Sequence, residues 1–258
     1  IHKFYEYLEI SGTSPKTKYL YQLALKDFGE IFQDRDINLI THKDHTPFMK
    51  EMKKRYPNNT TCNIRLRNIR AFLRWCRDHG EIEKLPFKIG QLPTRKKKPR
   101  YFTDTEMENI LDEAHNNEEM HARIWVHWKT GMRLRELSKS YYEDGFVEIY
   151  DPIKHGKERT IPIDKETAKY YNIAKEGEYV PTTISTKFKE ILKKLNYRHT
   201  RSGDTRHFHC LRHTFAVRTY YETRDIYRVK VLLGHSSVKT TEKYANFNIA
   251  KLERDFDI

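Results

Sequence analysis

The sequence predicts a mainly α-helical protein of two domains, the second of which contains a small antiparallel β-sheet. Apolar residues recur at intervals of three and four over several segments, as in helices that bury one face. Short β-type runs are confined to residues 146–163. A basic stretch with two prolines, residues 91–100, is typical of an extended linker. We therefore expect an all-helical domain over residues 1–90 and a mostly helical domain, ending in a tail helix, over residues 101–258.

Two helices are predicted in the N-terminal domain. The first begins at Ser14 and Pro15, because serine caps helices and proline suits the first helical position, and it runs to about residue 32. The second spans about residues 59–77. Its apolar stripe consists of Leu66, Ile69, Leu73 and Cys76.

A stripe of arginines is displaced by one residue from this apolar stripe. It consists of Arg67, Arg70, Arg74 and Arg77, and no acidic residue lies between residues 62 and 77. Like charges at such spacings repel by about 0.2–0.5 kcal/mol per i,i+4 pair. A solvated face with splayed side chains is one interpretation. We favour the other, a face that contacts phosphates.

The predicted linker is itself basic. Residues 91–100 contain no acidic residue and five basic ones, Arg95, Lys96, Lys97, Lys98 and Arg100. A run of this kind is often only a solvated tether. It would also span a DNA backbone well, and both interpretations stay open.

In the C-terminal domain, Thr103 and Glu106 predict a capping box at the start of the first helix. A later helix is expected to end at Gly131, which places Arg133 just past the helix end, where it can point into a cleft. Residues 146–163 predict a β-hairpin with its turn at residues 154–157. A further helix is expected after residue 185.

The stretch from His209 to Tyr244 contains most of the reactive side chains. His209 and Arg212 lie three residues apart, so on a helix they share a face. The apolar residues beside them, expected to face a core, are Phe208, Leu211 and Phe215. One helix would therefore bury one side and present an imidazole and a guanidinium on the next.

A second helix in this stretch is expected to start at Asp225 and to stop at Gly234, a normal C-terminal glycine. His235 follows in the turn. One of the two serines after it can cap another helix, with Tyr244 two turns into that helix. An arginine, two histidines and a late tyrosine suit chemistry on a phosphate.

The charge balance is strongly positive. There are 49 Lys and Arg residues against 36 Asp and Glu residues, which gives a net charge of +13 and a pI of about 9.4. Such a surface suits a polyanion, of which nucleic acid is the commonest. The alternative is a solvated basic surface without such a partner, and the arginine stripe favours nucleic acid.

The three cysteines, Cys62, Cys76 and Cys210, form no C-x-x-C pair. An odd count without pairing predicts a reducing cytosol rather than a disulfide framework. No apolar run approaches the length of a membrane span, so no membrane partner is expected. The first residues do not resemble a signal peptide, and the sequence leaves open whether further residues precede Ile1.

Taken in order, these motifs resemble the signature of the tyrosine recombinases, the family of phage integrases and Xer-type enzymes. The motifs are Thr130-Gly131-Met132-Arg133 with Glu136-Leu137, then Lys154 before Lys157-Glu158-Arg159, then His209-x-x-Arg212-His213, Leu233-Gly234-His235 and Tyr244. Each motif alone is weak, but five in order are a strong signal. The resemblance covers nearly the whole chain. It implies a core-binding domain that clamps DNA, followed by a catalytic domain from about residue 101.

The resemblance implies transesterification of a DNA phosphodiester. Tyr244 would attack the phosphorus, forming a 3′-phosphotyrosyl bond and releasing a 5′-hydroxyl. Arg133 and Arg212 would grip the non-bridging oxygens in bidentate fashion. His235 would donate to the same oxygens. His209 is expected to accept the tyrosine proton.

Lys154 is expected to protonate the departing 5′ oxygen. The interval from Arg133 to Lys154 is shorter than in the family pattern, which leaves Lys157 as an alternative. Alignment of the Lys157-Glu158-Arg159 run with the family favours Lys154. A second departure is Arg135, where the family often has a small polar residue.

Glu136 and His213 are expected to hold neighbouring groups rather than to touch the substrate. His209 and His213 lie four apart and could instead hold a zinc ion, but residue 210 is not Glu and no third ligand has convincing spacing. With several cationic donors at one phosphate and the energy stored in the phosphotyrosyl bond, neither a metal, nor ATP, nor another cofactor is implied.

The sequence therefore predicts a site-specific recombinase or integrase that acts on double-stranded DNA at the nucleoid, in the cytoplasm. The alternatives are an accessory DNA-binding protein without catalysis and a type IB-topoisomerase-like enzyme that nicks and reseals one duplex. The tail, residues 245–258, has apolar residues at helical spacing. It could dock on a neighbouring protomer in a synaptic tetramer, or fold back on its own domain.

Overall fold

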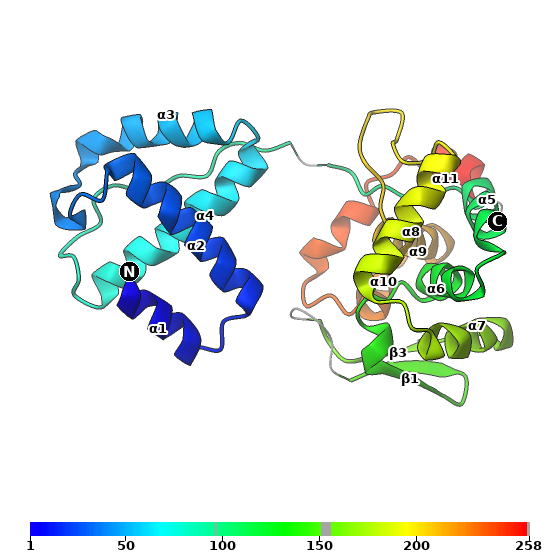
Figure 1. Cartoon of the computed structure of the whole chain (residues 1–258). Helices are drawn as coiled ribbons and strands as arrows, with labels where there is room; N and C mark the ends of the chain where they lie inside the picture. Colours follow the sequence, from blue (N-terminus) through cyan, green and yellow to red (C-terminus); the bar gives the residue numbers. More distant parts are fainter. Residues whose placement is uncertain (96, 151–155, 257–258) are drawn as a thin grey trace. The chain divides into compact units, whose positions relative to one another are not determined.

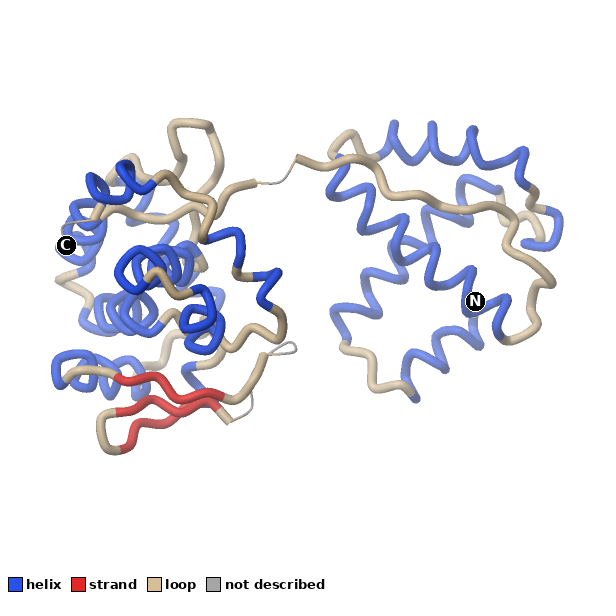
Figure 2. The backbone as a smooth tube through the Cα atoms, turned by 180° about the vertical axis from the view of Figure 1, so that it is seen from behind, coloured by secondary structure: helices blue, strands red, loops and turns tan. Residues whose placement is uncertain are grey.

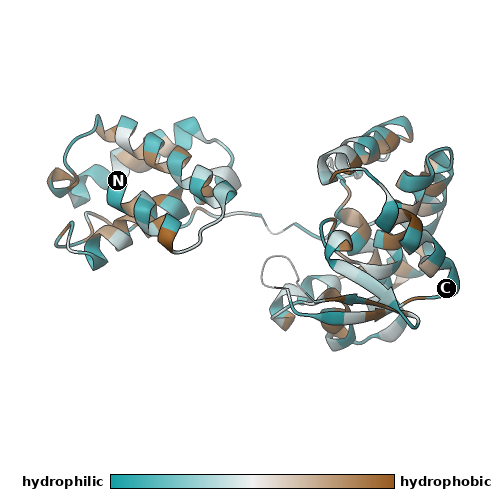
Figure 3. Ribbon diagram, turned by 60° about the horizontal axis from the view of Figure 1, so that its bottom comes forward, coloured by the Kyte–Doolittle hydropathy of each residue, from teal (hydrophilic) through white to brown (hydrophobic). Residues whose placement is uncertain are grey.

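The computed structural model describes residues 1–95, 97–150 and 156–256. Helices dominate these residues, and their strands form a small three-stranded antiparallel sheet, which confirms the predicted fold class (Figures 1 and 2). The chain divides into two compact units, Ile1–Lys96 and Lys97–Ile258. In both units, apolar and polar residues alternate along the helices, as expected for helices that each cover a core (Figure 3).

Unit 1 is built from helices and short 3₁₀ turns. Ser14 caps the second helix by accepting a hydrogen bond from the Thr17 N–H, as predicted. The fourth helix likewise begins after Asn58, whose side chain accepts from the Thr60 N–H. The elements are α1 (His2–Ile10), α2 (Pro15–Phe32), η1 (Ile37–Leu39), η2 (His42–Asp44), α3 (His45–Arg55) and α4 (Asn59–Asp78).

The core of unit 1 lies between α2 and α4. The predicted apolar stripe of α4, from Leu66 to Cys76, is buried there. Phe87 and Ile89, which follow α4, are buried in the same core. The chain after them stays on unit 1, because the Asn63 side chain bonds both the N–H (2.8 Å) and the carbonyl (2.9 Å) of Leu92. The described part of residues 91–100 contains no helix or strand.

Unit 2 opens with the predicted capping box, in which Thr103 and Glu106 each accept a hydrogen bond from the other's backbone N–H. Its helices surround α9, and the sheet lies beside α7 (Figure 1). The elements are α5 (Asp104–Ala114), α6 (Glu118–Thr130), η3 (Leu137–Lys139), β1 (Ser140–Glu143), β2 (Phe146–Ile149), β3 (Arg159–Pro162), α7 (Lys165–Glu176), α8 (Pro181–Lys194), α9 (Cys210–Thr223), α10 (Ile226–Leu233), η4 (Val238–Thr240), η5 (Glu242–Tyr244) and α11 (Ile249–Asp255).

The sheet has the order β1-β2-β3, and the predicted hairpin is formed by β2 and β3. Val147 lies opposite Ile161, and both side chains are buried. The edge strand β1 was not predicted. Only its first residue, Ser140, is buried while the other three are exposed, so it lacks the alternation that marks a half-buried strand.

The helix expected to carry Tyr244 is absent from the described residues, so that prediction was wrong. The segment instead forms two 3₁₀ turns, closed by bonds from the Thr241 N–H to the Val238 carbonyl (2.6 Å) and from the Tyr244 N–H to the Thr241 carbonyl (2.9 Å). Two reasons favour the turns over an α-helix. β-branched residues crowd this segment, and the bond between the Thr241 hydroxyl and His235 ties it to the turn after α10.

The tail folds back on unit 2, which is one of the two arrangements left open by the sequence. Leu252 and Phe256 are buried beside Ala216 and Val217 of α9. The Tyr101 hydroxyl also donates to Asp255 at 2.6 Å.

Candidate active site

The site is organised around a buried carboxylate, that of Glu136, whose side chain is fully shielded from solvent. Arg133 Nη1 lies 2.6 Å from Oε1, Arg159 Nη2 lies 2.6 Å from Oε2, and Arg212 Nη1 lies 3.9 Å from Oε2. Burial alone would raise the pKa of Glu136, but hydrogen bonds from Arg159 and Arg133 outweigh it and hold the pKa below 4.5. One ionised carboxylate therefore gathers three guanidinium groups, which leaves a surplus of positive charge.

Arg212 is almost completely buried and joins two helix ends. Its Nη1 donates to the Gly131 carbonyl at 2.7 Å, where α6 ends, and its Nη2 donates to the Leu233 carbonyl at 2.6 Å, where α10 ends. Burial lowers the pKa of Arg212 to about 9, which leaves the guanidinium charged at neutral pH. Arg133 is more accessible, with 22% of its side chain exposed against 2% for Arg212.

Both helices that Arg212 joins end at a glycine in the left-handed conformation, with φ of 62° at Gly131 and at Gly234. Neither position has room for a side chain. A Cβ on Gly131 would lie 2.3 Å from the Phe215 ring, and one on Gly234 would lie 2.9 Å from the Lys157 carbonyl. These glycines let the backbone carbonyls approach Arg212 closely.

His235 lies in the turn after Gly234, as predicted, and is buried. Its Nδ1 lies 2.9 Å from the Thr241 hydroxyl. Burial, and then the nearby charge of Arg212, lower the pKa of His235 to about 3, so the ring is neutral at pH 7. When Thr241 donates to Nδ1, the proton of the ring sits on Nε2, which can then donate to a phosphate oxygen.

Tyr244 is 1% exposed and packs against Val229 and Leu233 of α10 and Val217 of α9. Its hydroxyl lies 2.9 Å from Nδ1 of His213. Burial raises the pKa of Tyr244 above its usual value, although Arg212 and Arg133 act in the opposite direction. The phenol is therefore uncharged in the DNA-free protein.

His209, which the sequence predicts on the same helix face as Arg212, occupies the N-cap position of α9, one residue before the helix begins at Cys210. Its ring meets that of His213 edge-on, with 4.9 Å between centroids. Desolvation, and then Arg212, lower the pKa of His209 to about 4, which leaves a neutral imidazole able to accept a proton. Among the described residues, however, the imidazole that contacts the Tyr244 hydroxyl is His213 rather than His209.

A cavity of about 440 Å³ opens beside these residues, with His209 and Arg212 in its wall. Its other polar lining comes from α6, from α8 and from the segment before α9, and none of the lining residues is acidic. These other polar residues are His127, Ser185, Thr186, Lys189, Arg198 and His207. The cavity is thus a cationic recess, with room for more than a single phosphate group, that adjoins the arginine cluster.

Lys154, the expected acid, lies outside the described residues, so its role stays a prediction. The backbone N–H of Lys157 donates to the Gly234 carbonyl at 3.1 Å. The described segment just before β3 therefore lies against the turn that carries His235. The choice between Lys154 and Lys157 is not decided by this contact.

The predicted DNA-binding residues of unit 1 differ in how free their side chains are. Arg67 and Arg74 are exposed, whereas Arg70 is half-buried and donates to the Gly90 carbonyl at 3.3 Å. Arg77 is exposed but lies 2.7 Å from Asp78. The four arginines of the stripe therefore differ in their exposure and in their partners.

The predicted basic residues around the unit boundary are also exposed where they are described. Arg95 and Lys98 are exposed, and Lys97 lies 2.6 Å from Asp204. Lys96 lies outside the described residues. A role of this run in binding DNA stays a prediction.

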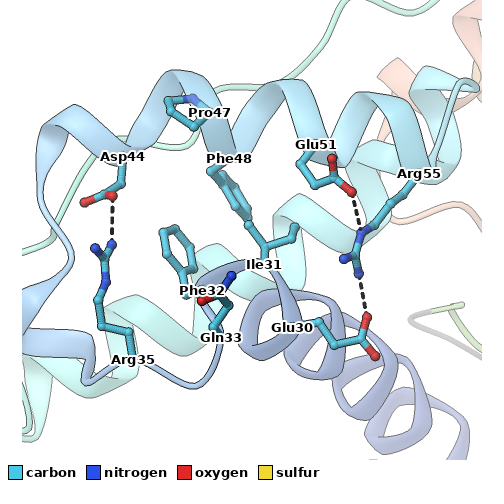
Figure 4. Close-up of a pocket in the computed structure, with 10 residues that line it drawn as sticks. All are labelled: Glu30, Ile31, Phe32, Gln33, Arg35, Asp44, Pro47, Phe48, Glu51 and Arg55. Carbon is cyan, nitrogen blue, oxygen red and sulfur yellow. Dashed lines mark hydrogen bonds and ion pairs between the residues drawn. The ribbon is translucent and has the colours of Figure 1, made fainter.

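Unit 1 also contains a cavity of about 600 Å³, and its lining differs from that of the recess (Figure 4). Its charged side chains pair with one another. Arg35 lies 2.7 Å from Asp44, and Arg55 lies 2.7 Å from Glu30 and 3.1 Å from Glu51. These pairs leave little unbalanced positive charge for a phosphate.

Three residues near the site were given no role from the sequence, although one of them, Arg159, belongs to a quoted motif. Arg159 precedes Ile161 by two positions on the inward face of β3, and a basic residue on an inward face signals a buried anionic partner. Thr241, which holds His235, gives no such signal. Lys243 has its Nζ 4.9 Å from the centre of the Tyr244 ring, and desolvation, followed by Arg212, lowers its pKa.

Two features that would indicate other classes of site are absent from the described residues. They contain no group of three or more His, Cys, Asp or Glu side chains placed to hold a metal ion. None of the helices among them combines the length and the apolar character needed to cross a membrane.

Comparison with known proteins gives the family. Residues 100–250 match the model of the phage integrase family, and residues 1–80 match the phage integrase N-terminal SAM-like domain. The tyrosine recombinase XerC of Pediococcus pentosaceus is 25% identical, over 99% of this chain and 96% of that protein. A lambda integrase dimer bound to a COC′ core site has a similar fold, with a TM-score of 0.77 and 19% identity over 95% of this chain and 75% of that one.

A lambda integrase tetramer bound to a Holliday junction has the same fold, with a TM-score of 0.75 and 17% identity over 93% of this chain and 75% of that one. At such identities the solved structures establish the fold alone. The family model covers more than half of the chain. The chain therefore belongs to the phage integrase family and is a tyrosine recombinase.

Proposed function

We propose that this tyrosine recombinase is a site-specific DNA strand transferase, with Tyr244 as its nucleophile and Arg133, Arg212 and His235 as its phosphate-binding residues. The main support is the arrangement around Glu136, which holds both arginines in one cluster. Burial raises the pKa of Tyr244, and both arginines lie close enough to oppose that rise.

The cleavage step exchanges one phosphoester for another. The Tyr244 oxygen forms a bond to phosphorus, the bond from phosphorus to the 5′ oxygen breaks, and the DNA 3′ end is left on the enzyme. Attack by a 5′-hydroxyl from another strand reverses these changes. Because each step conserves one phosphoester, no ATP or metal ion is part of the proposed reaction.

Each cationic residue has a distinct part in this proposal. Arg133 and Arg212 stabilise the charge that grows on the non-bridging oxygens, where each charge-assisted hydrogen bond contributes about 1.5–3 kcal/mol. His235 donates to the same oxygens through the nitrogen that Thr241 leaves free. His209 accepts a proton during attack, and Lys154 supplies the proton for the departing 5′ oxygen.

Double-stranded DNA is the proposed substrate. A net charge of +13, the exposed arginines of α4 and the cationic recess beside the site all suit a polyanion. Lambda integrase, which shares the fold, binds a core site as a dimer and a Holliday junction as a tetramer. By analogy, we propose a synaptic tetramer that acts on DNA at the nucleoid in the cytoplasm.

The tail helix α11 would take part in this assembly only after a rearrangement. In the single chain it packs on α9 and is bonded to Tyr101. A contact in trans therefore requires α11 to leave its own unit and to occupy the same position on a neighbour.

Covalent capture on a random DNA library tests the function directly. The protein is incubated with nicked duplexes of random sequence, the adducts are isolated under denaturing conditions, and the attached DNA is sequenced. We expect a shared target sequence attached through Tyr244. The absence of any adduct, or an adduct that survives the Tyr244→Phe substitution, would contradict the proposal.

A further inference from the structure

The hydroxyl of Tyr244 is hydrogen-bonded to His213, a histidine that has no part in the proposed cleavage step. Nδ1 of His213 lies 2.9 Å from the phenol oxygen, and both side chains are buried. His213 belongs to α9, whereas Tyr244 ends the 3₁₀ turn η5. The bond therefore links the reactive end of the phenol to the helix that also carries Arg212.

Packing determines where His213 and Tyr244 lie, but it does not determine the direction of the phenol oxygen. The Tyr244 ring is surrounded by apolar groups of α9 and α10, including Ala216 and Leu233. Dispersion contacts of this kind have no preferred direction. A hydrogen bond does have one, because it weakens steeply once the donor angle departs from linear. His213 is thus the directional contact of the Tyr244 hydroxyl among the described residues.

The charges around the pair decide where the phenol proton lies. Burial has the largest effect on His213, and the groups that face it, which are His209, Lys243, His207 and Arg212, also disfavour an imidazolium there. Together they lower the pKa of His213 to about 2, while burial raises that of Tyr244. The phenol proton therefore stays on the tyrosine in the resting protein. In the tautomer of the neutral His213 ring that carries its hydrogen on Nε2, Nδ1 accepts the hydrogen bond from the phenol.

We propose that His213 is a positioning residue for the strand-transfer reaction: by accepting the hydrogen bond of the Tyr244 hydroxyl, it holds the phenol oxygen beside Arg212 for attack on the phosphorus. This inference rests on the proposed function, in which Tyr244 is the nucleophile. It gives the second histidine of the His-x-x-Arg-His motif a part that differs from the parts of His209 and Arg212.

A latch is the opposite possibility for the same contact. In that case His213 would hold a buried tyrosine away from the DNA, and removal of the bond would speed cleavage. Positioning predicts slower cleavage instead, because a reactive atom displaced by about 1 Å loses roughly 100-fold in rate. The sign of the change therefore separates the two roles.

Single-turnover capture of a nicked duplex by the full chain tests the proposal. In His213→Leu the acceptor is lost, and we expect the rate constant of adduct formation to fall by roughly 100-fold with DNA affinity unchanged. In His213→Asn the amide oxygen can replace Nδ1, and we expect recovery to within roughly tenfold of the original rate. A His213→Leu rate that equals or exceeds the original would overturn the proposal.

A control substitution shows whether the loss of any shielded imidazole in unit 2 slows capture. His121, which is half-buried, serves for this purpose. His121 contacts the rings of Trp125 and Tyr170 and none of the site residues. His121→Leu should therefore leave the capture rate unchanged. If it slows capture as much as His213→Leu, the effect is general destabilisation and the positioning role is wrong.

Two further measurements separate positioning from other roles of His213. Thermal unfolding of His213→Leu, Tyr244→Phe and the double variant should reveal a coupling energy between the two positions, because each single change removes the same bond. The pH dependence of capture should keep its shape in His213→Asn, since a neutral acceptor does not titrate between pH 6 and 9. Loss of the acidic limb would make His213 the proton acceptor and would overturn the proposal.

The outcomes also distinguish failure of this inference from failure of the proposed function. An adduct that persists in Tyr244→Phe removes the nucleophile assignment and with it both proposals. Normal capture by His213→Leu, together with no capture by Tyr244→Phe, removes the positioning role alone.

Discussion

The two units both present arginines, but they hold them in different ways. The arginines of α4 in unit 1 follow one another along a single helix, and three of them, Arg67, Arg74 and Arg77, are exposed. Three arginines of unit 2, Arg133, Arg159 and Arg212, come from separate segments of the chain and converge on the buried Glu136. The first arrangement is set by helical periodicity, whereas the second depends on the tertiary fold.

This difference predicts opposite responses to mutation. Exposed arginines contribute little to folding, because exposed charges stay hydrated and gain little from pairing. Buried guanidinium groups depend on their carboxylate, because a charge left without its partner inside a protein is costly. Substitutions in the Glu136 cluster of unit 2 should therefore disturb folding and catalysis together. Substitutions of the exposed arginines of α4 should disturb DNA binding alone.

The largest effect is expected from Glu136→Gln. The amide keeps the shape of the side chain but leaves three guanidinium groups, two of them buried, without their negative partner, so the free energy of unfolding should fall by about 3–5 kcal/mol. Urea denaturation of the full chain measures this change. Glu113→Gln is the matched control in the same unit, because Glu113 pairs with the exposed Lys194, and its effect should stay within about 0–1 kcal/mol.

The effect of Glu136→Gln should also depend on pH. The folded-state pKa of Glu136 lies below its ordinary value of 4.5. A carboxyl group of this kind stabilises the fold above pH 4.5, and the stabilisation is lost as the pH falls through the folded-state pKa. The original and variant proteins should therefore differ most above pH 4.5 and converge below it. A difference that does not change with pH would show that the charge of Glu136 is not what holds the cluster.

A smaller effect is expected from Gly234→Ala. The left-handed backbone adds about 1–2 kcal/mol of strain, and the collision with the Lys157 carbonyl and Arg159 adds about 1–3 kcal/mol. Gly12 in unit 1 is the control, because its φ is 65° but nothing lies within 4 Å of an added Cβ. Gly12→Ala should show the strain alone. Equal losses in urea denaturation would mean that the turn before His235 has room to adjust.

The smallest effect is expected on α4. Replacing Arg67 and Arg74 with alanine should weaken DNA binding by roughly 10- to 100-fold, or about 1.4–2.7 kcal/mol, and flatten the dependence of log K on log salt by up to about 1.8. Titrations at several salt concentrations measure both quantities. Arg35→Ala, which removes an arginine paired with Asp44, should change neither. An unaltered slope in the double variant would show that the stripe does not contact phosphate.

Much of the fold could be predicted because its signals are local. The serine at position 14, the capping box at Thr103 and the glycine at position 234 each mark a helix end within a few residues of sequence. The turns around Tyr244 were mistaken for a helix, since the bond between His235 and Thr241 that favours them joins side chains whose approach depends on the fold.

For the site, the sequence indicates which residues to consider but not how they contact one another. Glu136 was expected to hold neighbouring groups, yet nothing in the sequence indicates that it binds three arginines at once. His209 was expected to accept the proton of Tyr244, a role that stays a prediction, and the sequence does not indicate that His213 is the histidine bonded to the Tyr244 hydroxyl. The two histidines differ by one helical turn, and only the position of η5 against α9 distinguishes them.

The bond between Tyr101 and Asp255 has a consequence for how unit 2 can be rebuilt. The segment around Tyr101 therefore touches the segment around Asp255, far along the chain of unit 2. The centres of the Tyr101 and Phe256 rings also lie 5.5 Å apart. A short peptide could therefore bridge these two segments, and new ends could be opened at an exposed loop such as residues 201–203. Unit 2 is thus suited to circular permutation.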